Sequence, residues 1–225
     1  MTYSLAGRCP ETNQIGFAVA TSSVAVGARV GAVVPGCVVF SQCRTDPRLH
    51  QDGLKAFEHT QDPETILAAM VEAATAPHWR QFGVLTTQGD GAHYTGASCL
   101  GHAGGIIGEN SIAIGNFLGS ADVLPSMIAS FEAANGTLEE RLLAGMLAGE
   151  AAGSERDPLQ SAAIVVMEAD GLKNTDLRID DSRTPLQDLL KLVKAWLPKS
   201  APYRLRALDP DNAPSSSEVE GNLPE

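Results

Sequence analysis

The chain has 225 residues, of which 44% are hydrophobic and 19% are charged, a composition typical of a folded globular domain. Its formal net charge of −11 excludes a surface built for nucleic acid, because such a surface needs clustered Lys and Arg. The start lacks a basic segment followed by an apolar run, and no apolar stretch approaches membrane-spanning length. We therefore expect a cytoplasmic protein with no nucleic-acid partner and no membrane partner.

The four cysteines, Cys9, Cys37, Cys43 and Cys99, show neither a C-x-x-C pair nor the spacing of metal ligands. In a chain without a visible export signal, thiols are expected to stay reduced. The glycine-rich segment 101–108 lacks the Lys-Ser/Thr ending of a phosphate loop. We predict free thiols, no metal, no cofactor, and a flexible loop over a pocket at 101–108.

In chain order, the first third is predicted to be β structure. Apolar runs at 3–8 and 15–20 flank a polar turn that contains Pro10 and Asn13, so they should form a hairpin. Runs at 30–34 and 37–42 are rich in β-branched residues and predict two more strands, separated by Pro35-Gly36.

Helices are predicted at 52–59 and from Asp62 onward, where Asp62 is the N-cap and Pro63 takes the first helical position. Strands are predicted at 81–86, 93–95 and 111–115. Two helices at 121–134 and 138–152 follow, and Thr137 with Glu140 matches a capping box between them. Strands at 162–168 and 176–180 and a helix at 186–197 complete the pattern.

This order alternates blocks of strands with pairs of helices, which favours antiparallel sheets covered by helices. We predict an α+β fold, a four-layer αββα sandwich with two mainly antiparallel sheets between helix layers. A single domain should span residues 1–198. Residues 199–225 are acidic and rich in Pro and Ser, which predicts a C-terminal tail that is either disordered or packed on the domain or a second copy.

Thr2 is the leading catalytic candidate. Removal of Met1 would leave Thr2 with a hydroxyl nucleophile and a free α-amine. This amine titrates at about pH 8 and can act as the base for the hydroxyl. This is the chemistry of N-terminal-nucleophile (Ntn) hydrolases. It predicts hydrolysis of a small amide-like substrate. Asn116 is the predicted oxyanion donor, because Gly115 beside it lets the backbone approach closely.

Five further residues are predicted to bind substrate, and each has a structural alternative. Ser22 and Ser23 follow a strand, where serines often serve a turn. Gln42 ends a strand and, like Asn116, could instead be a buried polar group satisfied by backbone. Arg178 and Asp180 share one face of a strand, where they either recognise a substrate carboxylate or form a structural ion pair.

Several segments between the start and about residue 197 carry a family resemblance. They include Thr2-Tyr3-Ser4-Leu5, Arg80-Gln81-Phe82-Gly83-Val84, Gly115-Asn116, Gln160-Ser161-Ala162-Ala163 and Asp176-Leu177-Arg178-Ile179-Asp180-Asp181. These segments resemble an uncharacterised "domain of unknown function" family, number ten-twenty-eight, which is grouped with the Ntn hydrolases. The resemblance implies the αββα sandwich and implies no known substrate.

A second hypothesis is a catalytically silent protein on the same fold that binds a small molecule or belongs to an assembly. Proteasome-like relatives place an Asp and a Lys in the strands after the nucleophile. Here segments 18–20 and 32–34 contain only Ala and Val, and Arg29 is the nearest cation. Under either hypothesis we expect a homo-oligomer, with a dimer favoured, and a small-molecule substrate or ligand.

Overall fold

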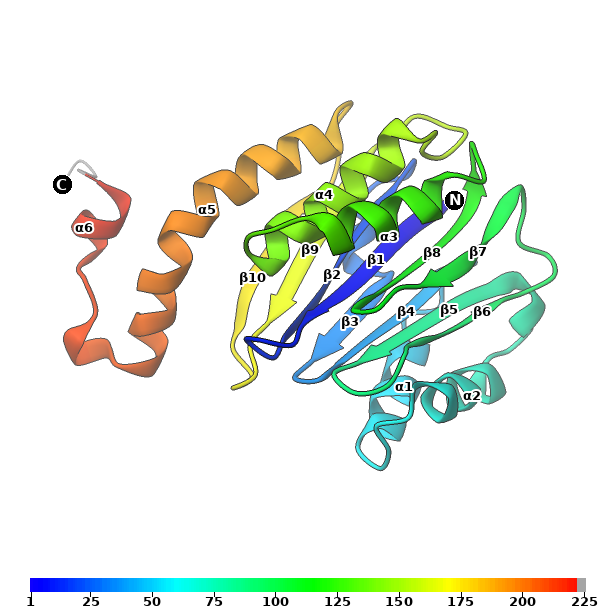
Figure 1. The fold of residues 1–225 in the computed structure, drawn as a ribbon, viewed down its shortest axis with the longest axis horizontal. Coiled ribbons are helices and arrows are strands. Elements are labelled where there is room, and N and C mark those ends of the chain that lie inside the picture. The colour runs from blue at the N-terminus through cyan, green and yellow to red at the C-terminus, as the bar shows by residue number, and fades with distance from the viewer. Residues whose placement is uncertain (222–225) are drawn as a thin grey trace.

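The computed structural model describes residues 1–221, and in this range ten strands form two antiparallel sheets (Figure 1). The six-stranded sheet consists, in spatial order, of β10 (Lys173–Ile179), β9 (Ser161–Met167), β2 (Gln14–Thr21), β1 (Thr2–Cys9), β8 (Ser111–Leu118) and β7 (His102–Ile107). The four-stranded sheet consists of β3 (Gly31–Val34), β4 (Cys37–Cys43), β5 (Arg80–Thr86) and β6 (Ala92–Thr95). The predicted α+β fold with two antiparallel sheets is confirmed.

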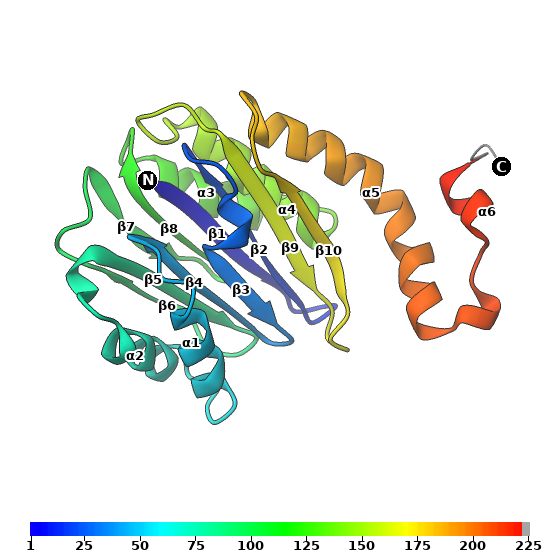
Figure 2. The same ribbon diagram turned by 180° about the vertical axis from the view of Figure 1, so that it is seen from behind.

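Helices pack against both sheets. The longer ones are α1 (Leu49–Phe57), α2 (Pro63–Ala73), α3 (Val123–Ala133), α4 (Leu138–Ala151) and α5 (Pro185–Leu208). Short turns of helix are η1 (Val26–Ala28), η2 (Pro77–Trp79), η3 (Pro210–Asn212) and α6 (Ser216–Glu220). Figures 1 and 2 show α3 and α4 beside the six-stranded sheet and α1 and α2 beside the four-stranded one, in agreement with their contacts.

The predicted helix caps are present. The Asp62 carboxylate accepts the Thr65 backbone N–H at 3.0 Å and so begins α2. The Thr137 hydroxyl and the Glu140 carboxylate each accept a backbone N–H from the other's residue, which completes the capping box of α4. Both caps satisfy N–H groups that have no partner within the helix.

Buried apolar side chains form three clusters that follow the alternation of the strands. On β1, Tyr3 and Leu5 face α3 and α4, where they meet side chains such as Phe131 and Leu142. On the other face of that sheet, Phe17 meets Phe40 of the four-stranded sheet with ring centroids 5.5 Å apart. A third cluster lies between the four-stranded sheet and the helices α1 and α2. The β-strand period of two residues explains this division.

The segment 101–108 differs from its prediction as a flexible loop. It contains β7, which pairs with β8 at Gly105↔Ile114 and Ile107↔Ile112. Glycines have low β propensity, and the segment lacks an alternating pattern, so the sequence gives no strand signal. The structure explains Gly105 by close approach, because a Cβ there would lie 2.5 Å from the His93 ring.

The last helix also differs from its prediction. It continues from the predicted end at residue 197 through Pro198 and Pro202 to Leu208. Proline removes one backbone donor from a helix, which is why the sequence predicts an end here. The Ser200 hydroxyl donates to the Leu197 carbonyl at 2.9 Å and so partners one carbonyl of this turn. The helix runs away from the sheets in Figure 1.

Part of the predicted tail therefore belongs to α5, and residues 209–220 turn back along it. The Tyr203 hydroxyl donates to the Glu220 carboxylate at 2.7 Å, and Lys199 pairs with the same carboxylate. The Arg206 guanidinium donates to the Pro214 carbonyl at 3.0 Å. The rest of the tail, residues 222–225, lies outside the described residues. Nowhere in residues 1–221 is a helix both long and apolar enough to cross a membrane.

Candidate active site

Thr2, Thr21 and Asn116 lie next to one another at one end of three neighbouring inner strands of the six-stranded sheet. Thr2 begins β1 directly opposite Asn116 of β8, and Thr21 ends β2 on the other side. Side chains of directly opposite residues project to the same face of a sheet. The face is the one that meets the four-stranded sheet, since Ser4, two residues along β1, contacts Gln42 of β4. The Thr2 and Thr21 hydroxyl oxygens are 3.4 Å apart and buried.

The carbonyl group of Met1 lies between the two threonine hydroxyls. The Met1 carbonyl oxygen accepts hydrogen bonds from the hydroxyls of both Thr2 and Thr21. The Met1 side chain is 43% exposed, and its sulfur lies 3.8 Å from the Ser22 hydroxyl. Two hydroxyl donors that converge on one acyl oxygen are the kind of arrangement that stabilises an oxyanion.

A buried carboxylate, Glu155, lies beside the terminal amine. Its Oε2 accepts the Ser22 backbone N–H at 3.1 Å, whereas Oε1 has no hydrogen-bond partner among residues 1–221. Burial raises the pKa of Glu155, and the Ser22 donors and the positive terminal amine partly oppose this rise. A carboxyl group whose charge is disfavoured by burial and favoured by an amine is typical of functional sites.

The turn after α4 explains why Glu155 reaches this position. Ser154 adopts a left-handed backbone with φ of 52°, and its carbonyl accepts the Gly119 N–H at 2.9 Å. Glu155 itself forms an isolated β bridge with Leu118 at the end of β8. These contacts hold the chain at the end of β8, the strand that carries Asn116. They place the Glu155 carboxylate beside the neighbouring strand ends, where it contacts Ser22.

Behind the threonines, a chain of buried amides connects the two sheets. The Ser4 hydroxyl donates to Gln42 Oε1 at 2.7 Å, and Gln42 Nε2 donates to Gln81 Oε1 at 2.7 Å. Asn116 Nδ2 donates to the same Gln81 oxygen at 3.0 Å. Gln81 Nε2 reaches the Gly115 carbonyl at 2.8 Å and the Thr95 hydroxyl at 2.9 Å. This network orients the Asn116 amide and leaves little freedom to its members.

An open cavity of about 390 Å³ adjoins the threonines, and its lining includes Met1 and Asn116. The other lining residues are Cys43, Arg44, Trp79, Ser98, Leu100, Phe117 and Asp157. The Arg44 guanidinium stacks on the Trp79 ring at 3.7 Å, so the wall combines a cation with an aromatic face. Cys43 and Phe117 adopt left-handed φ values of 73° and 59°, which side chains other than glycine rarely do.

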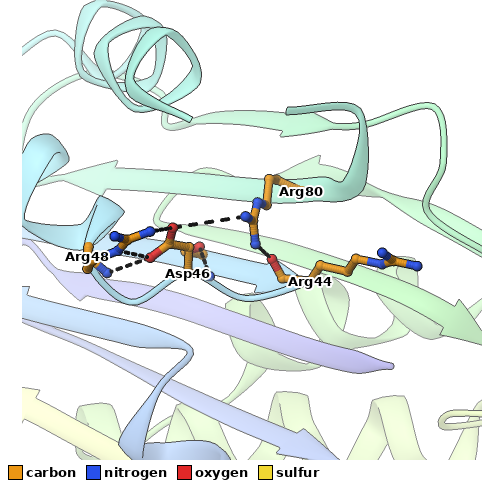
Figure 3. Close-up of polar contacts among 5 residues, drawn as sticks. Arg44, Asp46, Arg48 and Arg80 are labelled. Carbon is orange, nitrogen blue, oxygen red and sulfur yellow. Dashed lines mark hydrogen bonds and ion pairs between the residues drawn. The ribbon is translucent and has the colours of Figure 1, made fainter. Parts of the chain in front are cut away.

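An ionic cluster fixes the chain that leaves β4 at this wall (Figure 3). The Asp46 carboxylate accepts two hydrogen bonds from Arg48, at 2.9 and 2.8 Å, and Arg80 lies 4.0 Å from it. These cations, Arg48 first, hold the pKa of Asp46 at about 2. Arg80 also donates to the Arg44 carbonyl, while the Arg44 side chain points away from the cluster in Figure 3. The cluster therefore anchors the backbone and leaves the Arg44 guanidinium to the cavity.

The structure brings together some of the residues predicted from sequence. Asn116 lines the cavity, Thr2 lies directly opposite Asn116 on β1, and Ser22 lies beside Met1 and Glu155. Gln42 is fully buried behind them in the amide network, where its partners are the side chains of Ser4 and Gln81. The Ser23 hydroxyl accepts from Arg29 at 2.6 Å, on the exposed loop after β2.

Arg178 and Asp180 are not brought to the cavity. They form the expected pair, with the Arg178 Nη2 2.8 Å from the Asp180 carboxylate, and both side chains are partly exposed. They lie on β10, which is separated from β1 by β9 and β2. At the usual spacing of strands, this places β10 roughly 14 Å from β1.

Several residues of the site carry no sequence signal. Arg44 and Asp157 line the cavity, while Thr21 contacts Met1 and Glu155 contacts Ser22, and these four residues come from turns and strand ends that are far apart in the chain. Gln81 lies in one of the segments that resemble the family, which is the only hint for it. A larger depression of about 650 Å³, lined by residues such as Gln160 and Asp181, contains none of the residues predicted to act.

The fold and the site define an α+β protein with a cavity at the start of its first strand, between two antiparallel sheets. A sequence model described as "Family of unknown function (DUF1028)" matches residues 2–189, and the chain belongs to this family. The chain is also similar to the crystal structure of protein SPO2555 from Silicibacter pomeroyi, a DUF1028 protein, with 30% identity and a TM-score of 0.83. That match covers 90% of this chain and 89% of the other. No curated protein matches the chain.

Proposed function

We propose that the protein is an Ntn-type amidohydrolase that acts on a small amide-like substrate, with Thr2 as nucleophile once Met1 is removed. The observation that carries this proposal is the acyl oxygen held between the Thr2 and Thr21 hydroxyls beside an open cavity. When the Met1 residue is absent, the Thr2 hydroxyl is free to attack a substrate carbonyl and the Thr21 hydroxyl is free to donate to its oxygen. A cavity of about 390 Å³ suits a small molecule.

The fold supports this class. Three buried clusters lie between helices and the first sheet, between the sheets, and between the second sheet and its helices, as a four-layer αββα sandwich requires. The nucleophile of an Ntn hydrolase is the first residue of a strand that opens into the space between the sheets. Thr2 meets that description, because it begins β1 and its face is the one that contacts β4.

In the proposed reaction, the Thr2 hydroxyl attacks the substrate carbonyl and its own α-amine accepts the proton. The Thr21 hydroxyl and the second Asn116 amide hydrogen stabilise the oxyanion, since Gln81 engages the first one. The amine then returns the proton to the leaving nitrogen, and water hydrolyses the Thr2 ester. Glu155 takes the place of the charged residues that the strands lack, and its carboxylate favours the protonated amine electrostatically.

Residues of the cavity wall, such as Arg44 and Trp79, orient the substrate in this proposal. Arg44, stacked on Trp79, offers a cation whose planar face is already covered, which suits recognition of a carboxylate or carbonyl group. Ser22 lies close enough to contact a substrate at the Met1 position. We also propose that the protein acts as a homo-oligomer, with a dimer favoured.

A catalytically silent binding protein is the second candidate. It is favoured by the segments 18–20 and 32–34, which contain only Ala and Val where proteasome-like relatives place an Asp and a Lys. A protein that retains Met1 would keep the cavity as a ligand site and have no base. In that case a thermal-shift screen of small metabolites should find a ligand, and Thr2 substitutions should leave the ligand's affinity nearly unchanged.

The test is hydrolysis of a panel of small acyl p-nitroanilides by protein treated with methionine aminopeptidase. We expect Thr2→Ala to remove activity by at least about 10²-fold and Thr2→Ser to retain part of it, because serine keeps the hydroxyl. Ser23→Ala is the matched control, since its hydroxyl is engaged by Arg29, and it should keep the full rate. Activity that survives Thr2→Ala would exclude the proposed nucleophile.

A further inference from the structure

Two cysteines that are far apart in the sequence meet at the start of β5. Cys43 is the last residue of β4 and pairs across the sheet with Arg80, the first residue of β5. On the other side of Arg80, the Gly96 N–H donates to the Arg80 carbonyl at 2.9 Å. The chain then turns, with the Cys99 N–H donating to the Gly96 carbonyl at 3.0 Å. This turn returns the Cys99 sulfur to within 3.5 Å of the Arg80 carbonyl oxygen.

The two thiols are therefore neighbours around Arg80, because Cys43 is the strand partner of Arg80 and the Cys99 sulfur contacts the Arg80 carbonyl oxygen. Both are partly exposed, and Cys43 lines the cavity together with Ser98 and Leu100, the residues on either side of Cys99. Cys9 lies at the opposite end of β1 from Thr2, and Cys37 is buried. The other two thiols of the chain thus occupy different surroundings.

The surroundings make the pair asymmetric. The neighbouring Cys99 thiol lowers the pKa of Cys43 to about 6, against the opposing effect of burial, and the terminal amine and Arg44 add to the lowering. The neighbouring Cys43 and burial raise the pKa of Cys99. One thiol is thus a thiolate at neutral pH, while its neighbour keeps its proton. This is the arrangement of a reactive cysteine beside a resolving cysteine.

We propose that Cys43 and Cys99 form a peroxide-sensitive thiol pair, in which Cys43 is oxidised first and Cys99 closes a reversible disulfide. The oxidant is a hydroperoxide, with hydrogen peroxide as the simplest member. The Cys43 thiolate attacks one peroxide oxygen, the O–O bond breaks, and protonation of the leaving hydroxide gives Cys43 sulfenic acid and water. The Cys99 sulfur then attacks the Cys43 sulfur, and the sulfenic oxygen leaves as a second water.

This site is independent of the proposed hydrolase, although its product changes the same cavity. A Cys43–Cys99 bond would join the end of β4 to the turn that carries Ser98 and Leu100, and both segments form the cavity wall. The wall would become one cross-linked unit. A two-electron dithiol reductant would reverse the change by thiol–disulfide exchange.

The experiment treats the full-length reduced protein with stoichiometric hydrogen peroxide, blocks remaining thiols by alkylation, and maps peptides without reduction. We expect a Cys43–Cys99 linked peptide with a mass loss of about 2 Da, the two hydrogens removed, and its disappearance after dithiothreitol. Cys99→Ser should stop the reaction at Cys43 and give a dimedone adduct there. Cys43→Ser should abolish the link, and the matched control Cys9→Ser should form it at the wild-type rate.

A measurement on the wild-type protein removes any dependence on the folding of the variants. The rate of Cys43 alkylation should reach half its maximum at about pH 6, whereas alkylation of Cys99 should stay slow through neutral pH. Equal alkylation rates at the two cysteines, first oxidation at Cys9, or a disulfide between any other pair would each overturn the proposal.

Discussion

Gln81→Leu tests the buried amide network that supports Asn116. Gln81 is fully buried, and its oxygen accepts from Gln42 and Asn116. Leucine has a similar volume but no polar atoms, so two buried amide groups would each lose a hydrogen bond. A buried donor left without a partner costs about 1–3 kcal/mol. The gain from burying leucine in place of an amide offsets about 1 kcal/mol.

We therefore expect Gln81→Leu to lower the free energy of unfolding by about 1–5 kcal/mol. The measurement is urea unfolding followed by circular dichroism and tryptophan fluorescence, with an unchanged dependence on urea concentration. The control is Gln51→Leu on the exposed surface of α1, which should change stability by less than about 0.5 kcal/mol. Asn116 should also lose its fixed orientation, so the variant should lose activity in the p-nitroanilide assay.

A double-mutant cycle isolates the network from other effects of the substitution. Gln42→Leu and Gln81→Leu remove two partners of one hydrogen bond at 2.7 Å. The double variant should be more stable than the sum of the two single losses predicts, by about 1–2 kcal/mol. A loss below about 1 kcal/mol for Gln81→Leu, or strictly additive losses, would refute the reasoning that the amides depend on one another.

Three more predictions concern the site and the packing. Burial raises the pKa of Glu155, so its contribution to stability is present below the ordinary value of 4.5 and is lost as pH rises through the folded value. Glu155→Gln should thus gain stability over wild type at pH 7 but not near pH 4, and a gain that is independent of pH would contradict this. Thr137→Ala should cost about 1 kcal/mol in thermal unfolding because it removes the α4 cap, and no loss would show that the cap is dispensable. Gly145→Ala should cost about 1–3 kcal/mol, because a Cβ there would lie 2.4 Å from Leu5 and 2.9 Å from the Met127 carbonyl, whereas Gly104→Ala, with nothing within 4 Å, is its control.

Local chemistry made much of the fold predictable. The hairpin of β1 and β2 follows from two apolar runs around a turn, and the caps at Asp62 and Thr137 follow from residue types at fixed offsets. These signals depend on residues within a few positions of one another. By contrast, β7 takes its conformation from pairing with β8, and the part of α5 beyond Pro198 contacts the returning tail through Tyr203 and Glu220. Such tertiary contacts leave no periodic signal in the sequence.

The site was predictable only in part, for the same reason. Thr2 is visible because its chemistry depends on its place in the chain, and Asn116 because it follows a glycine in a strand. Glu155 and Thr21 depend on which strand ends meet, and this is set by the sheet order. Arg178 and Asp180 form a clear sequence pattern, yet the strand order places them at the far edge of the sheet. Spacing shows which side chains share a face, but not which strand lies next to them.

We propose that Thr2 is an activated nucleophile once Met1 is removed. We would treat two samples with a β-lactone that acylates hydroxyl nucleophiles, one with Met1 enzymatically removed and one that keeps Met1. Peptide mass spectrometry would then map the adducts. We predict one adduct on Thr2 in the Met1-free protein and none on Thr2 in the capped protein, because only the first has a free amine to accept the hydroxyl proton. An intact, Met1-free protein without an adduct on Thr2 would contradict the claim and leave the silent binding protein as the function to pursue.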